Sequence, residues 1–422
     1  MKRIQLMKIG GAVLNKPQNF SFLFDIITKH CTSPTIFVFS AFSDLSRKLR
    51  QSARVARSEG LDSAMQYFAN VKQQLFELVK SLFATDELAN SVNFKLNVLF
   101  ESFEKILFGI AITKELTKRT LDRVLSFGEY FSSIVLEEFL KSKCIDAIFL
   151  DSSKLIITDT NYGNAKPILD RTAEAINRNL LPHLEKSNLV FLPGFIGSSE
   201  IGTITTMGFE SSNLTALLIA SIVEADSVTF WTDVEGIRTS DPKIVENTQL
   251  VPEISFDDAL LASYNGIKLV HPSMYEFFVR YPNIKFIYKS AFSPNNGETQ
   301  IVQKTNFQPK FVLISEPYYF IELNDEKEKD YLQEGIMYYT SKDYSFLLTE
   351  EFPYNEINKK VNVLTLFYFE PYDVFEALNQ ISNKVRFVIS NVRQKIYKIL
   401  VEEDYLIEVA NFLHNFLILK NK

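Results

Sequence analysis

Short runs of apolar and β-branched residues, bounded by turn-forming residues, recur along the first 300 residues of the chain. Most of these runs are apolar almost continuously, as in strands that are buried on both faces of a parallel sheet. We predict seven such strands: Ile4–Ile9, Thr35–Ser40, Ala147–Asp151, Leu155–Thr158, Asn188–Pro193, Ser227–Thr232 and Lys285–Lys289. Helical patterns, among them Thr215–Val223, Ser255–Tyr264 and the segment after Gly128, lie between the strands. This alternation predicts a layered α/β domain with a mainly parallel sheet.

Two regions depart from the alternation. Residues from about 50 to 143 show helical periodicity with no clear strand, which predicts a helical subdomain. From about Lys310 the pattern changes to short alternating strands and two helices. The strands are Lys310–Ser315, Tyr344–Thr349, Val361–Tyr368, Arg386–Ser390 and Gln394–Val401, and the helices are Pro371–Ser382 and Tyr405–Phe416. We therefore expect a domain over residues 1–303 and a small α+β domain over residues 304–422.

Composition narrows the class of protein. The chain has 45 Lys plus Arg against 51 Asp plus Glu, a net charge of −6, which is not the footprint of a nucleic-acid binder. It contains no apolar run long enough to span a membrane and no secretory signal pattern at its start. Two cysteines and four scattered histidines exclude a disulfide framework and give no metal-ligand spacing. We expect a cytoplasmic protein without a metal site of its own, and with neither nucleic acid nor membrane as partner.

The first candidate for chemistry follows the first predicted strand. Gly10 and Gly11 come directly after it, and Lys8 is its last polar residue. Adjacent glycines let backbone N–H groups approach an anion, and the lysine adds a positive charge. A plain turn explains the glycine pair equally simply.

Two further loops have the same character. The segment 205–213 (TTMGFESSN) runs into an apolar helix, for which Ser212 or Asn213 is the expected N-cap, and a helix N-terminus of this kind binds anions. The segment 231–243 (WTDVEGIRTSDPK) joins an acidic, hydroxyl-rich strand end to cations, a composition that suits nucleotide and metal-phosphate contacts. Helix capping and an ordinary surface turn are the simpler alternatives.

The order of these segments carries more information than any one of them. The chain reads KIGGAV at 8–13, SAFSDLS at 40–46, GEYFSS at 128–133, LIITDTNYGNA at 155–165, PGFIG at 193–197, TTMGFESSNLTA at 205–216, WTDVEGIRTSDPK at 231–243, ISFDDALLASYNGIKLVHP at 254–272 and SAFSPNNGETQI at 290–301. This series resembles the aspartate kinase branch of the amino-acid kinase family. The resemblance implies a three-layer α/β/α domain that transfers the γ-phosphoryl group of ATP, with Mg²⁺, to the side-chain carboxylate of L-aspartate, the first step of aspartate-derived amino-acid biosynthesis.

The resemblance also implies roles for individual residues. Lys8 would face the transferring phosphoryl group, and Glu129 would pair with the ammonium of the substrate. On the nucleotide side the matching positions are Gly10, Gly11, Thr232, Asp233, Asp241, Lys243 and Lys268. On the substrate side they are Ser40, Ser46, Glu129 and Ser212, and Asn213 is the second candidate catalytic residue. We expect Glu129 to open a helix, where its charge would also be favourable without any substrate.

The substrate loop departs from the family pattern G-R-G-G-S-D. The arginine that would hold a substrate carboxylate is Phe209, and the acidic residue is Asn213. Losing a bidentate arginine contact costs roughly 2–5 kcal/mol. Asn213 is less decisive, because an aspartate nucleophile is already ionised at neutral pH and needs no general base. A catalytically impaired, nucleotide-binding or regulatory paralogue, or a kinase for another carboxylate, therefore remains an alternative.

The two predicted domains differ in their glycine content. The chain has only 14, and 11 of them lie in or beside the motifs of the first domain. The tail resembles the ACT modules that follow the kinase domain in aspartate kinases, where they pair subunits and bind effector amino acids at a glycine-containing loop. Gly335 is the only glycine after Gly297. We expect the tail to form a homodimer rather than to sense an effector.

Overall fold

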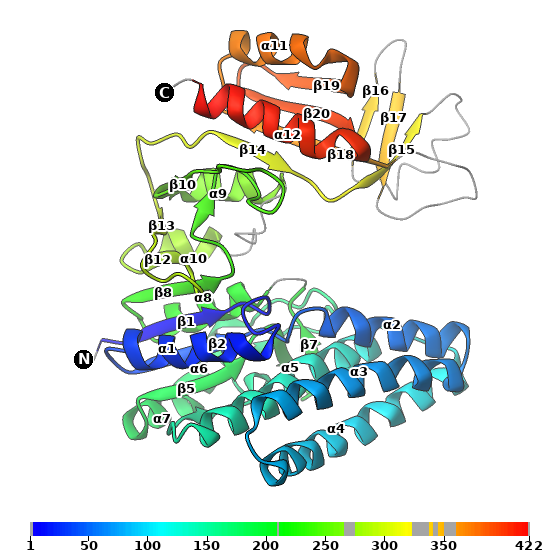
Figure 1. Ribbon diagram of the computed structural model, residues 1–422. Helices are drawn as coiled ribbons and strands as arrows, with labels where there is room; N and C mark the ends of the chain where they lie inside the picture. Colours follow the sequence, from blue (N-terminus) through cyan, green and yellow to red (C-terminus); the bar gives the residue numbers. More distant parts are fainter. Residues whose placement is uncertain are drawn as a thin grey trace. The chain divides into compact units, whose positions relative to one another are not determined.

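The computed structural model describes residues 3–208, 211–265, 275–322, 337–340, 345–349 and 360–420. The chain divides into two compact units, Met1–Gly236 with His271–Gln303, and Ile237–Val270 with Lys304–Lys422. The second unit thus contains residues 237–270, which we expected within the first domain. Each unit is described by itself (Figure 1).

The first unit is built on a mainly parallel sheet. Its strands are β1 (Gln5–Ile9), β2 (Thr35–Phe39), β3 (Ile148–Phe149), β5 (Leu189–Pro193), β8 (Ser227–Thr232), β12 (Lys285–Ser290) and β13 (Glu298–Val302). Their order is β13-β12-β8-β1-β2-β5-β3, and only β13 runs antiparallel to its neighbour. Every residue of β2 is buried, as expected for a central strand covered on both faces. The predicted α/β fold with a mainly parallel sheet is confirmed.

Helices cover this sheet. Those of the first unit are α1 (Phe20–His30), α2 (Leu45–Ser58), α3 (Leu61–Leu82), α4 (Asp86–Thr113), α5 (Lys118–Ser142), α6 (Leu169–Asn179), α7 (Leu181–Lys186), α8 (Ser212–Ile222) and α10 (Tyr275–Arg280). Met7, Ile9 and Phe39 share one hydrophobic core with α1 to α5. The almost wholly buried α8 packs against β1, β2 and β8. A small sheet of β4 (Ile157–Thr158), β6 (Ile196–Ser199) and β7 (Ile204–Thr206) adjoins α5.

The predicted helical subdomain consists of α2 to α5 (Figure 1). Many of the chain's 37 phenylalanines pack in its interior. Phe100 contacts Phe68, Phe76 and Phe131 edge to face, with ring centroids 5.0–5.6 Å apart. Edge-to-face rings add about 0.5–1.5 kcal/mol per pair to the burial of their surface. The abundance of phenylalanine in the chain therefore contributes to the packing of this bundle.

The second unit carries an antiparallel sheet. Its elements are β9 (Ile237–Arg238), β10 (Leu250–Val251), β11 (Glu253–Ser255), α9 (Phe256–Ser263), β14 (Phe311–Ile314), β15 (Tyr318–Glu322), β16 (Met337–Thr340), β17 (Ser345–Thr349), β18 (Lys360–Phe367), α11 (Pro371–Gln380), β19 (Val385–Asn391), β20 (Ile396–Glu402) and α12 (Leu406–His414), followed by a π-helix, Asn415–Leu419. The sheet order is β16-β17-β15-β18-β20-β19, with β14 also paired to β18. The predicted order of strand, helix, strand, strand and helix corresponds to β18, α11, β19, β20 and α12. β15 and β16 were not predicted.

Candidate active site

The candidate residues of the first unit gather where four parallel strands end. β1, β2, β5 and β8 are neighbours in the sheet and point the same way, so their carboxyl ends meet at one edge. In open α/β sheets this edge is where ligands bind. Lys8 is the penultimate residue of β1, Ser40 follows β2, and Thr232 ends β8. In the sequence these residues lie at or near the ends of separate predicted strands, and the strand order brings those ends together.

The turn after β1 depends on its two glycines. The Gly10 N–H donates to the carbonyl of Trp231 at the end of β8 (3.1 Å). A Cβ on Gly11 would lie 2.4 Å from the carbonyl oxygen of Ala41, a distance that no side chain tolerates. The Lys8 ammonium lies 3.8 Å from where a Gly10 Cβ would be. The turn therefore keeps backbone and lysine close together, as an anion-binding loop requires.

Glu129 lies beneath the loop after β2. Its side chain is only 3% exposed, and its Oε1 accepts a 3.4 Å hydrogen bond from the N–H of Ala41. Its Oε2 is buried without a hydrogen-bond partner. Next to it, Ser132 Oγ accepts from the N–H of Phe42 (3.0 Å) and donates to the carbonyl of Gly128 (2.9 Å). The loop after β2 is thus attached to α5 at two points, and one carboxylate oxygen is left unsatisfied.

Burial without adequate partners changes the acidity of Glu129. Desolvation raises the pKa of Glu129 from its ordinary value of 4.5 to about 8, and the hydrogen bond from Ala41 only partly opposes this. An arriving cation would favour the ionised form and lower this pKa again. Our expectation that Glu129 opens a helix is wrong. It lies in the interior of α5, which begins at Lys118 with Thr117 as its N-cap, so the N-terminal charge effect does not explain it.

The loop after β5 meets the start of α8. The Gly194 N–H donates to the carbonyl of Phe39 (2.7 Å), and a Cβ on Gly194 would come within 2.6 Å of the Cβ of Ser212. Ser212 is therefore held against the carboxyl end of β5, and Asn213 follows it in the first helical turn. The N-cap is Ser211 rather than Ser212 or Asn213, which we had expected. Phe209, the departure from the family pattern, lies outside the described residues.

Ser46 reaches the same region from α2. A Cβ on Gly128 would lie 3.1 Å from Ser46 Oγ and 3.2 Å from the Cβ of Ala41. Gly128 therefore allows α2, α5 and the loop after β2 to approach one another closely. Ser46 and Glu129, both predicted on the substrate side, come together here. Lys8 and Gly10 adjoin Trp231, directly before the predicted nucleotide residues Thr232 and Asp233.

A second buried carboxylate, Asp122, was not predicted. It lies two helical turns before Glu129 on α5 and is fully buried. Its Oδ2 accepts from the N–H groups of Gly163 (3.0 Å) and Thr206 (2.9 Å), and its Oδ1 accepts from Thr206 Oγ1 (2.7 Å). Burial raises its pKa, and these hydrogen bonds oppose the rise. Asp122 thereby fixes the end of β7, directly before the loop that leads to α8. The signal in the sequence was an aspartate spaced seven residues from Glu129.

The remaining candidate residues belong to the second unit. Asp241 accepts from the N–H of Lys243 through Oδ1 (2.8 Å), and both residues are exposed. Asn411 of α12 donates to the carbonyl of Ile244 (3.0 Å) and accepts from the N–H of Glu246 (2.9 Å). The segment that carries Asp241 and Lys243 is thus attached to the C-terminal region. Lys268 lies outside the described residues.

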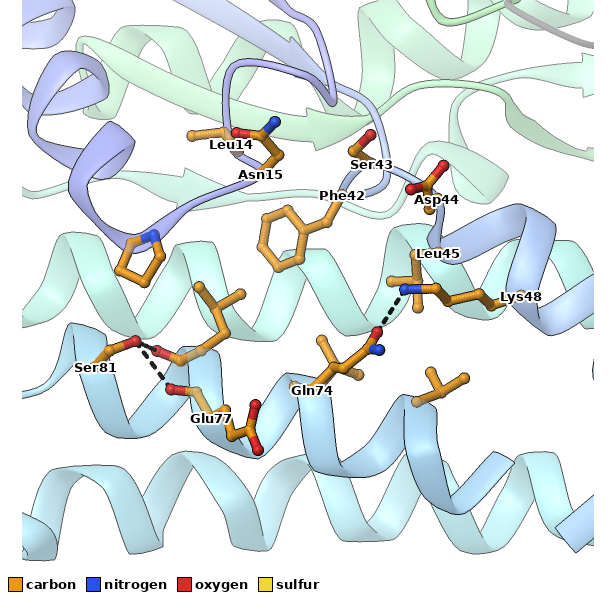
Figure 2. A pocket seen from close by; sticks show the side chains of 14 residues that line it. Leu14, Asn15, Phe42, Ser43, Asp44, Leu45, Lys48, Gln74, Glu77 and Ser81 are labelled. Atoms are coloured by element: carbon orange, nitrogen blue, oxygen red, sulfur yellow. Dashed lines mark hydrogen bonds between the residues drawn. The ribbon is translucent and has the colours of Figure 1, made fainter. Parts of the chain in front are cut away.

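A cavity of about 520 Å³ lies beside this edge, between α3 and the loops that follow β1 and β2 (Figure 2). Lys48 crosses it and donates to Gln74 on α3 (2.5 Å), and Asp44 and Glu77 also line it. None of the candidate residues that the structure describes lines this cavity. The candidate site is therefore defined by the strand ends rather than by this opening.

Comparison with known proteins agrees with this geometry. Residues 3–285 match the model of the amino acid kinase family, and the chain belongs to that family. It is 34% identical over 220 residues to lysine-sensitive aspartokinase 3 of Escherichia coli (strain K12), an alignment that covers 51% of this chain and 49% of that protein. It is 28% identical over 315 residues to chloroplastic aspartokinase 1 of Arabidopsis thaliana, covering 74% and 54% of the two chains. The chain spans about half the length of these curated relatives.

The fold has a counterpart among solved structures. The crystal structure of E. coli aspartokinase III in complex with aspartate and ADP superimposes with a TM-score of 0.73, covers 98% of this chain and 99% of its own, and is 21% identical. At that identity the match shows the fold alone. Together, the family match and the relatives confirm the resemblance to aspartate kinases that the motifs indicated. No helix in the described part of the chain is long and apolar enough to cross a membrane.

Proposed function

We propose that this chain is an aspartate kinase, which transfers the γ-phosphoryl group of ATP to the side-chain carboxylate of L-aspartate. The observation that carries the proposal is Glu129, a buried carboxylate with one unsatisfied oxygen beside the strand ends that hold Lys8 and the Gly10–Gly11 turn. A buried, half-satisfied carboxylate is costly, and the ammonium of an amino acid is the kind of partner that removes this cost. The relatives named aspartokinase support the same assignment.

In the proposed reaction a carboxylate oxygen of aspartate attacks the γ-phosphorus, and the bond from that phosphorus to the oxygen bridging it to the β-phosphate breaks. The products are aspartyl phosphate and ADP. The attacking carboxylate is ionised at neutral pH, so no proton has to be removed from it. Catalysis then rests on positioning and charge stabilisation. Lys8 would stabilise the transferring phosphoryl group, Glu129 would bind the ammonium, and Ser40, Ser46, Ser212 and Asn213 would orient the substrate.

We place the nucleotide against Gly10, Gly11, Thr232 and Asp233, with Asp241, Lys243 and Lys268 as further contacts. Magnesium would supply charge neutralisation of the phosphates. Within the described residues there is no group of three or more acidic, histidine or cysteine side chains that could hold a metal ion. Magnesium in phosphate sites commonly keeps phosphate and water ligands and takes few from the protein. A cytoplasmic location and a homodimer formed through the C-terminal region complete the proposal.

A second candidate function is a nucleotide-binding paralogue with impaired aspartate recognition. Because Phe209 stands in place of the family's arginine, another cation is needed to bind the second carboxylate of aspartate. The observation that favours the paralogue is that two arginines that could supply this cation have other partners. Arg171 pairs with Glu174 and Glu200 (3.6 and 3.5 Å), and Arg238 donates to the hydroxyl and the carbonyl of Thr248.

Release of ADP, measured with and without L-aspartate, separates the two. An aspartate kinase shows aspartate-dependent ADP release that Lys8→Ala lowers by at least about 100-fold. The matched control Lys16→Ala, at an exposed position in the segment between β1 and α1, should leave this release unchanged. Binding of ATP without turnover on aspartate contradicts the proposal and supports the paralogue. Turnover on another amino acid, but not on aspartate, would identify a kinase for a different carboxylate.

A further inference from the structure

Helix α4 presents an apolar stripe to solvent. Phe94 is 72% exposed, Val98 53%, Phe108 54% and Ile112 69%, although the opposite side of the same helix is buried in the core of the bundle. In Figure 1 this helix lies along the outer side of the helical subdomain. Isolated exposed apolar residues are ordinary, but four on one helix face mark an interaction surface.

The stripe also contains two opposite charges. At 3.6 residues per turn, six residues fall within an arc of about 80°. In chain order they are Phe94, Val98, Glu101, Lys105, Phe108 and Ile112, and all six are exposed. Neighbouring charges serve the fold instead, because Lys95 pairs with Glu138 of α5 (2.8 Å) and Glu104 pairs with Lys72 of α3 (2.7 Å). We call the six-residue set the α4 face.

The α4 face is complementary to itself in the antiparallel direction. Position 103 is its midpoint, since 94 and 112, 98 and 108, and 101 and 105 lie equally far on either side. Two copies of α4 laid antiparallel about that midpoint place Phe94 against Ile112, Val98 against Phe108, and Glu101 against Lys105. Every apolar residue meets an apolar one, and every charge meets its opposite. A two-fold interface requires this self-complementarity, because each subunit contributes the same patch.

We propose that the α4 face is an isologous interface between two copies of this chain. Within one chain Glu101 and Lys105 are also spaced to pair along the helix, so association brings two such pairs into a cluster of four alternating charges. One helix face buries less than the roughly 800 Å² per partner of a standard interface. We therefore expect the dissociation constant of this dimer to lie in the range of about 1–100 µM. This inference goes beyond the proposed function and does not depend on it.

Charge reversal tests the register of the interface. Sedimentation velocity of the full chain, over about 1–100 µM, is run on the wild type, Glu101→Lys, Lys105→Glu and the double variant with both changes. Each single reversal places like charges opposite each other and should weaken association at least about tenfold. The double variant restores opposite charges and should recover it to within about threefold. Glu185→Lys, an exposed position on α7 with the same change in net charge as Glu101→Lys, is the matched control for that variant and should behave as wild type.

The apolar part is tested with Phe108→Glu, which should abolish the same association. Any dimer formed through the C-terminal region is common to all variants, so only the difference between variants is read. Equal masses for the wild type and the single reversals at every concentration overturn the proposal, as does a double variant that stays as weak as the single ones. Binding of the wild type to lipid vesicles without self-association would assign the face to a membrane surface and also overturn it.

Discussion

Helix α5 carries two buried carboxylates, two helical turns apart, that differ in how well their oxygens are hydrogen-bonded. Around Asp122, three donors from Gly163 and Thr206 converge on the carboxylate at 2.7–3.0 Å. Around Glu129, one oxygen has a single 3.4 Å contact and the other has none. A satisfied buried charge stabilises the loops that supply its donors, whereas an unsatisfied one reduces stability. From this difference we assign Asp122 to the stability of the fold, and it supports our proposal that Glu129 binds a ligand.

The largest expected effect comes from Glu129→Gln. Loss of the pair with the substrate ammonium should lower kcat/KM for aspartate by about 30-fold to several thousand-fold, or roughly 2–5 kcal/mol. The same change removes a carboxyl group that ionises freely in the unfolded chain but unfavourably in the folded protein. The free energy of unfolding at pH 7 should therefore rise by about 1–3 kcal/mol. Kinetics and urea denaturation measure the two effects.

The sign of the stability change follows from the pKa of Glu129. Folding raises that pKa from 4.5 to about 8, so the folded protein retains a proton that the unfolded chain releases. The contribution of Glu129 to stability is fully present below about pH 4.5 and is lost as the pH rises through about 8. Glu137→Gln, on the exposed side of α5, is the matched control and should change neither quantity appreciably. A destabilised Glu129→Gln protein would contradict the contrast with Asp122.

Asp122→Ala should give the next largest effect, now on stability. It leaves two backbone N–H groups and one hydroxyl buried without their acceptor, which should lower the free energy of unfolding by about 2–4 kcal/mol. Asp122→Asn should lie between the wild type and the alanine variant, because its amide NH₂ faces donors. Urea denaturation measures both. An Asp122→Ala protein as stable as the wild type but inactive would place Asp122 in the chemistry and remove the distinction.

The pH dependence of substrate binding sharpens the comparison further. Because the pKa of Glu129 is raised to about 8, the carboxylate is mainly protonated at pH 6.5 and mainly ionised at pH 8.5. If only the ionised form binds aspartate, KM for aspartate should therefore fall roughly 25-fold over this interval as the pH rises. KM for ATP serves as the internal control and should not follow this profile. A profile that is unchanged in Glu129→Gln would show that another group titrates.

Thr206→Val should give the smallest effect. It removes one of the three hydrogen bonds to Asp122 and leaves the two backbone donors in place. The free energy of unfolding should fall by about 1 kcal/mol, with kcat/KM for aspartate within about twofold of the wild type. Thr203→Val, at a more exposed position on the same hairpin, provides the comparison. A loss as large as that of Asp122→Ala would show that the carboxylate depends on the hydroxyl alone.

The sequence predicted most of the first unit because its strands are continuous apolar runs. β1, β2, β5, β8 and β12 lie within one residue of their expected bounds. The order of the motifs indicated Lys8, Gly10, Gly11 and Glu129 as candidate residues. It did not indicate where Glu129 lies in its helix. Gly128 suggested a helix start, but no cap is found there, and the helix begins ten residues earlier at Lys118.

Other features depend on contacts between distant parts of the chain. Asp122 is an ordinary helix residue until Gly163 and Thr206 are brought to it, 41 and 84 residues away in sequence. β15 and β16 are short strands that complete the sheet only by pairing with β17 and β18. Residues 237–270 join the second unit through contacts such as Thr239 with His414 (2.8 Å), 175 residues apart. None of these pairings leaves a periodic pattern in the sequence.

Proton release on aspartate binding tests the central claim about Glu129 most directly. Isothermal titration calorimetry at pH 7, in buffers of different ionisation enthalpy and with a non-hydrolysable ATP analogue already bound, counts the protons exchanged. Our account predicts that wild-type protein releases close to one proton per aspartate at pH 7, that the number falls toward zero near pH 9, and that Glu129→Gln releases none. Binding without proton release, or an equal release from Glu129→Gln, would contradict it.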